Sequence, residues 1–293
     1  MQFRLIARAA LVAIAVAGCS SGTNSTTTPP PPPPSPTGQL YVGIGDIPGS
    51  LLVYDLPLTS TSTPAVTVAH DNSGPLALNS TTLAVTRPTN YSVSFFTLPL
   101  TSASGPYATL VTGGVIYPVF EPSGAFYYSA SNMIDVYTPP FSASSTPSSH
   151  IATPLLSAGP LSIGPSGDVY ELAGNVIGVV HNGALVTKLT AEPGTEFDAA
   201  AATATQLFVC EGTNNLAAQV YVYPLPLTAT ETPSLIIHPN TDAPGACVLD
   251  SSGDLYIGSA GIVSVLTPPF TASSHAAVQV NVHGGIGGLA IGQ

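Results

Sequence analysis

The sequence predicts an all-β fold built from one repeated unit of strands and turns. A strand ending in a turn of the type Pro-Leu-Thr or Pro-Phe-Thr recurs about every 43 residues, starting at Val53, Phe95, Val136, Val222 and Val265. A degenerate copy lies near Val180, and no segment after the first 19 residues has helical periodicity. Repeats of this length made only of strands and turns are typical of propeller blades. We therefore expect a six-bladed β-propeller of four-stranded blades.

Each unit opens with a short strand of small apolar residues, which suits the crowded centre where the blades converge. Six such innermost strands are expected, at 75–79, 117–121, 159–164, 198–203, 245–250 and 287–292. A tight turn with glycine follows, and then a β-rich second strand. This strand carries a tyrosine expected in the blade-packing core at Tyr41, Tyr127, Tyr170 and Tyr256. A third strand ends at the Pro turn, and a fourth, rich in Ser, Thr and Pro, is expected to protect the exposed edge.

The two ends of the repeated region predict how the ring closes. The region begins at Gln39 with the second strand of a blade and ends with an innermost strand at 287–292. The last strand is therefore expected to complete the first blade, which removes a free edge. One propeller domain at 39–293, monomeric, is the expected organisation.

The N-terminus has the features of an export signal. Residues 1–18 combine Arg4 and Arg8 with a short apolar run that is too brief to span a bilayer. The run ends in Val16-Ala17-Gly18-Cys19, which resembles the lipobox of bacterial lipoproteins. That resemblance implies lipid attachment at Cys19, cleavage before it, and a place in the bacterial cell envelope. An ordinary signal peptide with a chance cysteine is the alternative. Ser20 and Ser21 imply the outer membrane in a host with two membranes.

Residues 19–38 form the expected linker between anchor and domain. Its first half is rich in Ser and Thr, and its second half contains a run of prolines at 29–34. A proline run adopts a stiff, extended polyproline II helix, whereas Ser/Thr-rich chain is flexible. The expected role is to hold the domain away from the lipid surface.

Charge composition excludes one class of partner. Only 6% of residues are charged, with 4 Lys and Arg against 15 Asp and Glu. After removal of the leader only Arg87 and Lys188 remain as cations. Nucleic-acid binding needs a basic surface, so no nucleic-acid partner is expected.

Two further cysteines lie in predicted strands of neighbouring blades. Cys210 and Cys247 would meet an oxidising environment outside the cytoplasm, where disulfides form. A disulfide between them and two separate buried thiols are both consistent with the sequence.

One face of the ring is the expected ligand face. The loops between second and third strands and those between blades share one end of the domain, and loops carry function more often than strands. By this rule the face holds Asp46, Arg87, Asn90, Asn132, Asn175, Glu192, Glu196, Asp198, Glu211 and Asn214. Glu192, Glu196 and Asp198 form a carboxylate cluster that suits either calcium or a solvated surface.

Three histidines precede innermost strands of consecutive blades. His70 and His283 each lie six residues before equivalent leucines, so we expect them at related positions on this face. With the nearby acids they form a candidate metal set of His70, Asp71, His238, Asp242 and His283. The alternative is that these are ordinary polar loop residues, too far apart to coordinate one ion.

The repeated glycine, innermost strand, Ser-Gly turn and tyrosine strand resemble NHL-type and related six-bladed propellers over residues 38–293. The resemblance implies fold rather than activity, because this fold serves many functions. No nucleophile elbow or phosphate-binding loop is present. We expect a binding or scaffold module for an envelope protein or glycan, without a cofactor. The alternatives are a divalent-metal-dependent hydrolase similar to the gluconolactonase and regucalcin group, and a purely structural envelope protein.

Overall fold

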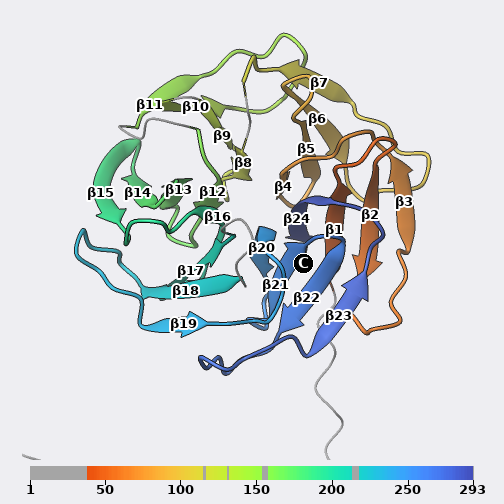
Figure 1. Ribbon diagram of the computed structural model, residues 1–293. Helices are drawn as coiled ribbons and strands as arrows, with labels where there is room; N and C mark the ends of the chain where they lie inside the picture. The colour runs from red at the N-terminus through yellow and green to blue at the C-terminus, as the bar shows by residue number, and fades with distance from the viewer. Residues whose placement is uncertain (1–37, 115–116, 131, 154–157, 213–217, 293) are drawn as a thin grey trace, which may run out of the picture. The chain divides into compact units, whose positions relative to one another are not determined.

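The computed structural model describes residues 38–114, 117–130, 132–153, 158–212 and 218–292. Across these residues the chain forms six separate four-stranded antiparallel sheets, arranged as blades around a centre (Figure 1). This confirms the predicted six-bladed propeller. Within the same ranges no helix is long and apolar enough to cross a membrane.

The blades are numbered in chain order, and each is given from its innermost to its outermost strand. Blade 1 holds β24 (Ile286–Gly292), β1 (Gln39–Ile44), β2 (Ser50–Asp55) and β3 (Val66–Ala69). Blade 2 holds β4 (Leu76–Leu78), β5 (Thr82–Arg87), β6 (Ser92–Thr97) and β7 (Ala108–Val111). Blade 3 holds β8 (Tyr117–Phe120), β9 (Phe126–Ala130), β10 (Met133–Tyr137) and β11 (Ser149–Ala152).

The second half of the ring follows the same order. Blade 4 holds β12 (Leu161–Ile163), β13 (Val169–Ala173), β14 (Val176–His181) and β15 (Ala184–Thr190). Blade 5 holds β16 (Phe197–Ala202), β17 (Gln206–Glu211), β18 (Gln219–Pro224) and β19 (Leu235–Ile237). Blade 6 holds β20 (Pro244–Leu249), β21 (Leu255–Ser259), β22 (Ile262–Leu266) and β23 (Val278–Asn281).

The ring closes by pairing the first strand with the last, as predicted. β1 pairs with β24 from Gln39↔Gly292 to Ile44↔Ile286, and on its other side with β2. β24 also contacts the innermost strands on both sides, β4 and β20. Ser35–Gln293 forms one compact unit, and every described strand pair lies inside it. This stretch therefore contains the whole closed ring, and we expect it to fold without the preceding residues.

The repeated Pro turn supplies an apolar plug to the core between blades. The leucine or phenylalanine before its Thr or Ser is buried at Leu58, Leu100, Phe141 and Leu227. Each packs into a cluster with strand residues; Leu100, for example, joins Leu51 and Phe96 from blades 1 and 2. Burying one such side chain contributes about 1.5–3 kcal/mol. This explains why the motif recurs in five of the six blades.

Blade 4 carries the degenerate copy because its outer strands are joined differently. β14 and β15 are connected directly by Asn182 and Gly183, which have φ angles of 49° and 76°. Two consecutive residues with positive φ, Asn then Gly, are the preferred connection of a tight β-hairpin. The apolar plug of the other blades is therefore replaced here by a short hairpin.

The prediction of an edge strand rich in Ser, Thr and Pro is wrong in one respect. The Ser- and Thr-rich stretches form loops, and the edge strands that follow them are short and mixed in polarity, such as Val-Thr-Val-Ala in β3. In the first loop the backbone N–H of Thr59 donates to Ser62 Oγ at 2.9 Å, and that of Ser62 to the Thr59 carbonyl at 3.0 Å. The same exchange occurs at 101 and 104, 142 and 145, and 271 and 274. These side chains bond their own backbone, which competes with strand formation.

Candidate functional site

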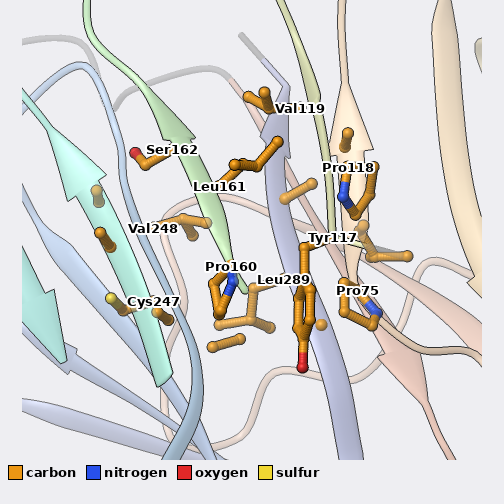
Figure 2. A pocket seen from close by; sticks show the side chains of 18 of the residues that line it. Pro75, Tyr117, Pro118, Val119, Pro160, Leu161, Ser162, Cys247, Val248 and Leu289 are labelled. Atoms are coloured by element: carbon orange, nitrogen blue, oxygen red, sulfur yellow. The ribbon is translucent and has the colours of Figure 1, made fainter. Parts of the chain in front are cut away.

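The centre of the ring encloses an apolar channel. A cavity of about 320 Å³ is lined by the innermost strands of all six blades. Figure 2 shows Pro75, Pro160 and Leu289 around the ring of Tyr117, with Cys247 on the neighbouring wall. Small residues such as those at 199–202 allow the six strands to approach one another, as the sequence predicted.

A second cavity of about 540 Å³ opens at one end of this channel. Its walls are mostly prolines, glycines and alanines, and its polar side chains are Tyr117, Glu196 and Asp198. We call this space the channel mouth. Concave sites with few convergent polar groups and volumes of roughly 300–1,000 Å³ are the usual form of a ligand site.

The mouth opens on the face that carries the loops between second and third strands and the loops between blades. We call it the crossover face. Backbone hydrogen bonds join the two kinds of loop in each of several blades: Thr112 N–H to Tyr91 O, Ala191 N–H to Asn175 O, and Val282 N–H to Gly261 O. The antiparallel order of every blade places both kinds of loop at the same end.

The predicted ligand-face residues lie at this end of the strands, in or beside those loops: Asp46, Arg87, Asn90, Asn132, Asn175, Glu192, Glu196, Asp198 and Glu211. Asn214 lies outside the described residues. Of this set only Glu196 and Asp198 line the channel mouth. A role in ligand binding for the others stays a prediction.

Asp198 is a half-buried carboxyl of the channel mouth. It lies near the start of β16 against Gly212, where an added Cβ would collide with Asp198 Oδ2. Burial raises its pKa to about 6, helped by the charges of Glu196 and Glu211, while a hydrogen bond from the Gly212 backbone opposes the shift. A group titrating near neutrality inside a cleft marks a functional site more often than a chance surface position.

Tyr117 lines the channel mouth and was not among the site residues predicted from the sequence. It begins β8, in blade 3, and faces the same cavity as Asp198 in blade 5. Burial and the Asp198 charge raise the pKa of its hydroxyl. One feature of the sequence could have indicated it. Tyr117 begins an innermost strand, and the innermost strands consist mainly of small residues.

The carboxylates Glu192, Glu196 and Asp198 are only partly brought together, because Glu192 does not line the channel mouth. Glu192 and Glu196 are exposed, whereas Asp198 is half-buried, and the charges of Glu196 and then Glu211 help to raise its pKa. Glu211 is 6% exposed and accepts a hydrogen bond from the Tyr221 hydroxyl at 2.7 Å. The bulge at the start of β16, between Phe197 and Ala199, sets the local direction of Asp198.

His70 is a buried histidine whose two ring nitrogens both make side-chain contacts. Its ring is 3% exposed, and both nitrogens are engaged: Nδ1 with Ser73 Oγ at 2.9 Å and Nε2 with Arg87 Nε at 3.1 Å. A metal ligand needs a free imidazole lone pair, so His70 does not fit the candidate metal set. In the described residues no three His, Cys, Asp or Glu side chains are grouped closely enough to hold a metal ion.

The other members of that set are exposed. His283 has a positive φ of 52°, and its backbone N–H donates to Asn281 Oδ1 at 2.9 Å. The backbone N–H of His238 donates to the Ala272 carbonyl at 3.3 Å. Asp71 and Asp242 are exposed. The two equivalent loop positions thus hold one buried and one exposed histidine.

Cys210 and Cys247 are free, buried thiols in one apolar cluster formed by blades 5 and 6. Burial, together with the hydrogen bond to Cys247, raises the pKa of Cys210 well above its ordinary value. The structure therefore contains the free-thiol form of the two that the sequence allowed, and the disulfide is not formed.

Comparison with known proteins shows the fold. No protein-family model and no curated protein matches the sequence. Among solved structures, the periplasmic gluconolactonase PpgL of Pseudomonas aeruginosa matches with a TM-score of 0.65 and 12% identity, covering 88% of this chain and 99% of that one.

Two further structures have the same type of similarity. A chain in a nidogen–laminin complex matches with a TM-score of 0.63 and 15% identity over 88% of this chain and 99% of that one. A putative 6-phosphogluconolactonase from Bacteroides uniformis matches with a TM-score of 0.59 and 13% identity, over 86% and 84%. At these identities the similarity concerns the fold alone. The chain is a six-bladed β-propeller.

Proposed function

We propose that this protein is a binding module of the bacterial cell envelope whose channel mouth receives a basic side chain of a protein partner. The observation that carries the proposal is the channel mouth itself. Its cavity contains Glu196 and Asp198, with Glu211 close behind, and no lysine or arginine among its lining residues. A cation placed there would relieve the repulsion that these carboxylates exert on one another.

The strength of this attraction follows from the partial burial of Asp198. Two opposite unit charges 4 Å apart attract by roughly 4 kcal/mol at an effective dielectric constant of about 20, before desolvation is subtracted. The surrounding field acts in the same direction, because 15 acidic residues face only Arg87 and Lys188 between residues 39 and 293. Such a field also steers basic partners toward the surface.

Protein binding is also a use made of this fold elsewhere. Structural neighbours include chains in a nidogen–laminin complex and in the mitotic checkpoint complex. These are properties of those proteins, and fold alone does not carry function. They support the choice of a protein as partner over a glycan.

The residues at the channel mouth also support one alternative, a hydrolase. Two neighbours are a gluconolactonase and a putative 6-phosphogluconolactonase, and a carboxyl with a pKa of about 6 suits a general base. The metal-dependent form of this alternative does not fit the described side chains, which contain no metal-binding group. We derive no metal-assisted step.

Attachment to the membrane is the second part of the proposal. The lipobox-like sequence at 16–19 supports lipid attachment at Cys19, and the Ser/Thr- and Pro-rich linker at 19–38 supports a domain held off the bilayer. Ser20 and Ser21 support the outer membrane where the host has one.

Binding of a short lysine peptide tests the channel mouth. The probe is an acetylated tetralysine amide, titrated into the 35–293 chain at low ionic strength, with a tetraglutamine peptide as reference. We expect Asp198→Asn to weaken tetralysine binding about tenfold, the equivalent of about 1.4 kcal/mol. Calorimetry or fluorescence anisotropy gives the dissociation constants.

Asp55→Asn is the matched control, because it also removes one negative charge. Asp55 is exposed and ends β2 of blade 1, on the face of the ring opposite the crossover face. Equal weakening by both variants would mean that only net charge matters and would contradict the proposal. Hydrolysis of gluconolactone that is lost in Asp198→Asn would establish the alternative instead.

A further inference from the structure

The arginine of the crossover face is held in place by a histidine. Arg87 ends β5 and is the only arginine between residues 39 and 293. Its Nε–H donates to His70 Nε2 at 3.1 Å. His70 comes from the loop between blades 1 and 2, so this contact joins two blades.

The hydrogen bonds determine which nitrogen of His70 carries the proton. Ser73 Oγ donates to the His70 carbonyl at 3.1 Å, so the same hydroxyl accepts from His70 Nδ1–H at 2.9 Å. Nε2 is then the unprotonated nitrogen and accepts from Arg87. Burial, followed by the Arg87 charge, lowers the pKa of His70 to about 4. The ring is also fixed by an edge contact with Phe96, with centroids 5.5 Å apart.

The uncharged His70 ring orients Arg87 and leaves the positive charge of the guanidinium uncompensated. Most buried or half-buried arginines are paired with a carboxylate, which cancels their charge. In the part of the chain that the structure describes, the only ion pairs join His150 to Asp135 and His181 to Asp168, and neither involves Arg87. With Nε occupied, the two terminal nitrogens of Arg87 keep the fork geometry that matches a carboxylate.

The loops around Arg87 are tied together and expose apolar side chains. With its amide oriented to satisfy both neighbours, Asn72 donates to Gly45 O at 2.8 Å and accepts from Thr89 N–H at 3.1 Å. In the neighbouring loops Ile47 is 74% and Tyr91 45% exposed, and Val111, the last residue of β7, is 72% exposed. Exposed aliphatic and aromatic side chains beside an arginine are the composition of a protein-binding surface.

We propose that Arg87, oriented by His70 and Ser73, binds the carboxylate of an acidic side chain on a protein partner, with Ile47, Tyr91 and Val111 as the apolar surround. A single carboxylate suits the site better than a phosphate. One guanidinium supplies the only positive charge here, and the acidic field of the domain opposes a dianion twice as strongly as a monoanion. This site is separate from the channel mouth, and neither proposal depends on the other.

The test uses the single arginine as a spectroscopic probe. The 35–293 chain labelled with ¹⁵N-arginine contains one arginine, so its side-chain NMR signals belong to Arg87. The probe ligand is acetyl-Leu-Glu-Leu amide, with acetyl-Leu-Gln-Leu amide as reference. We expect the Arg87 signals to shift and saturate with the glutamate peptide only. Arg87→Gln should weaken its binding, measured by signals of the surrounding loops, about tenfold or more.

Two variants separate binding from folding. His70→Phe keeps the aromatic packing but removes the acceptor; we expect faster exchange of the Arg87 Nε proton with water and binding weakened about threefold, the cost of ordering one side chain. Lys188→Gln removes the other cation and should leave the dissociation constant unchanged.

Each other outcome overturns the proposal. Unshifted Arg87 signals with the glutamate peptide would exclude the site. Tighter binding of methyl phosphate would exclude a carboxylate, and equal binding of glucuronate would exclude a protein as the source. The test at Arg87 is independent of the channel mouth. Asp198→Asn is expected to leave the shifts of the Arg87 NMR signals with the glutamate peptide unchanged.

Discussion

Deletion of residues 286–293, which contain β24, is expected to abolish cooperative folding of the propeller. β24 is the innermost strand of blade 1, and its antiparallel pairing with β1 closes the ring. It buries Leu289 and Ala290 and contacts β4 and β20 on either side. Loss of one buried leucine costs about 2–5 kcal/mol. Together with the ladder, this approaches the whole stability of a domain, about 5–15 kcal/mol.

Urea denaturation followed by circular dichroism and tyrosine fluorescence measures this effect. Two glycine variants refine it. A Cβ at Gly288 would lie 2.7 Å from the Leu76 backbone N, so Gly288→Ala should destabilise by roughly 1–3 kcal/mol, as overpacking does. Gly105→Ala, where a Cβ meets no atom within 4 Å, should be nearly neutral. A truncated chain with an unchanged midpoint and slope would contradict closure by β24.

Replacement of Cys19 by Ser is expected to abolish membrane attachment in a bacterial host. The thiol is the only group at which a lipoprotein signal accepts its diacylglyceryl group, and cleavage follows that step. The variant should therefore remain an unprocessed precursor without a palmitate label. Stable anchoring requires more than one acyl chain, so the processed wild-type protein should stay with membranes.

Palmitate labelling and fractionation distinguish these forms. Cys210→Ser is the control, because Cys210 lies buried inside the propeller domain. It should be labelled and processed like the wild type. A Cys19→Ser protein that is cleaved and still fractionates with membranes would show that the lipobox interpretation is wrong.

The fold was predictable because each blade repeats the same physical requirements. Small residues mark the innermost strands, and the observed β4, β8, β12, β16, β20 and β24 fall within a few residues of the predicted ranges. The apolar residue of the Pro turn recurs because it plugs the space between blades. Closure of the ring was predictable because the repeated region begins with the second strand of a blade and ends with an innermost strand. The Ser- and Thr-rich loops were misassigned because composition does not show that a side chain bonds its own backbone.

The candidate site was less predictable because it depends on contacts between blades. Asp198 and Tyr117 face one cavity from blades 5 and 3, and no spacing in the sequence relates them. The histidine that holds Arg87 was placed in a candidate metal set, with an ordinary polar loop residue as the alternative, since its burial and both hydrogen bonds appear only in the folded chain. Glu171 is a similar case, because in the sequence it resembles an ordinary strand residue. In the structure it is fully buried, and it accepts a hydrogen bond from Ser129 that joins blades 3 and 4.

Titration of the Asp198 carboxyl by ¹³C NMR, with and without the tetralysine peptide, tests the central functional claim most directly. We expect an apparent pKa of about 6 in the free 35–293 chain. A bound cation favours the ionised carboxylate, so the peptide should lower this pKa, and binding should strengthen as pH rises through 6. A free-chain pKa near the ordinary 3.8, or a raised pKa that the peptide leaves unchanged, would contradict a cation-binding channel mouth.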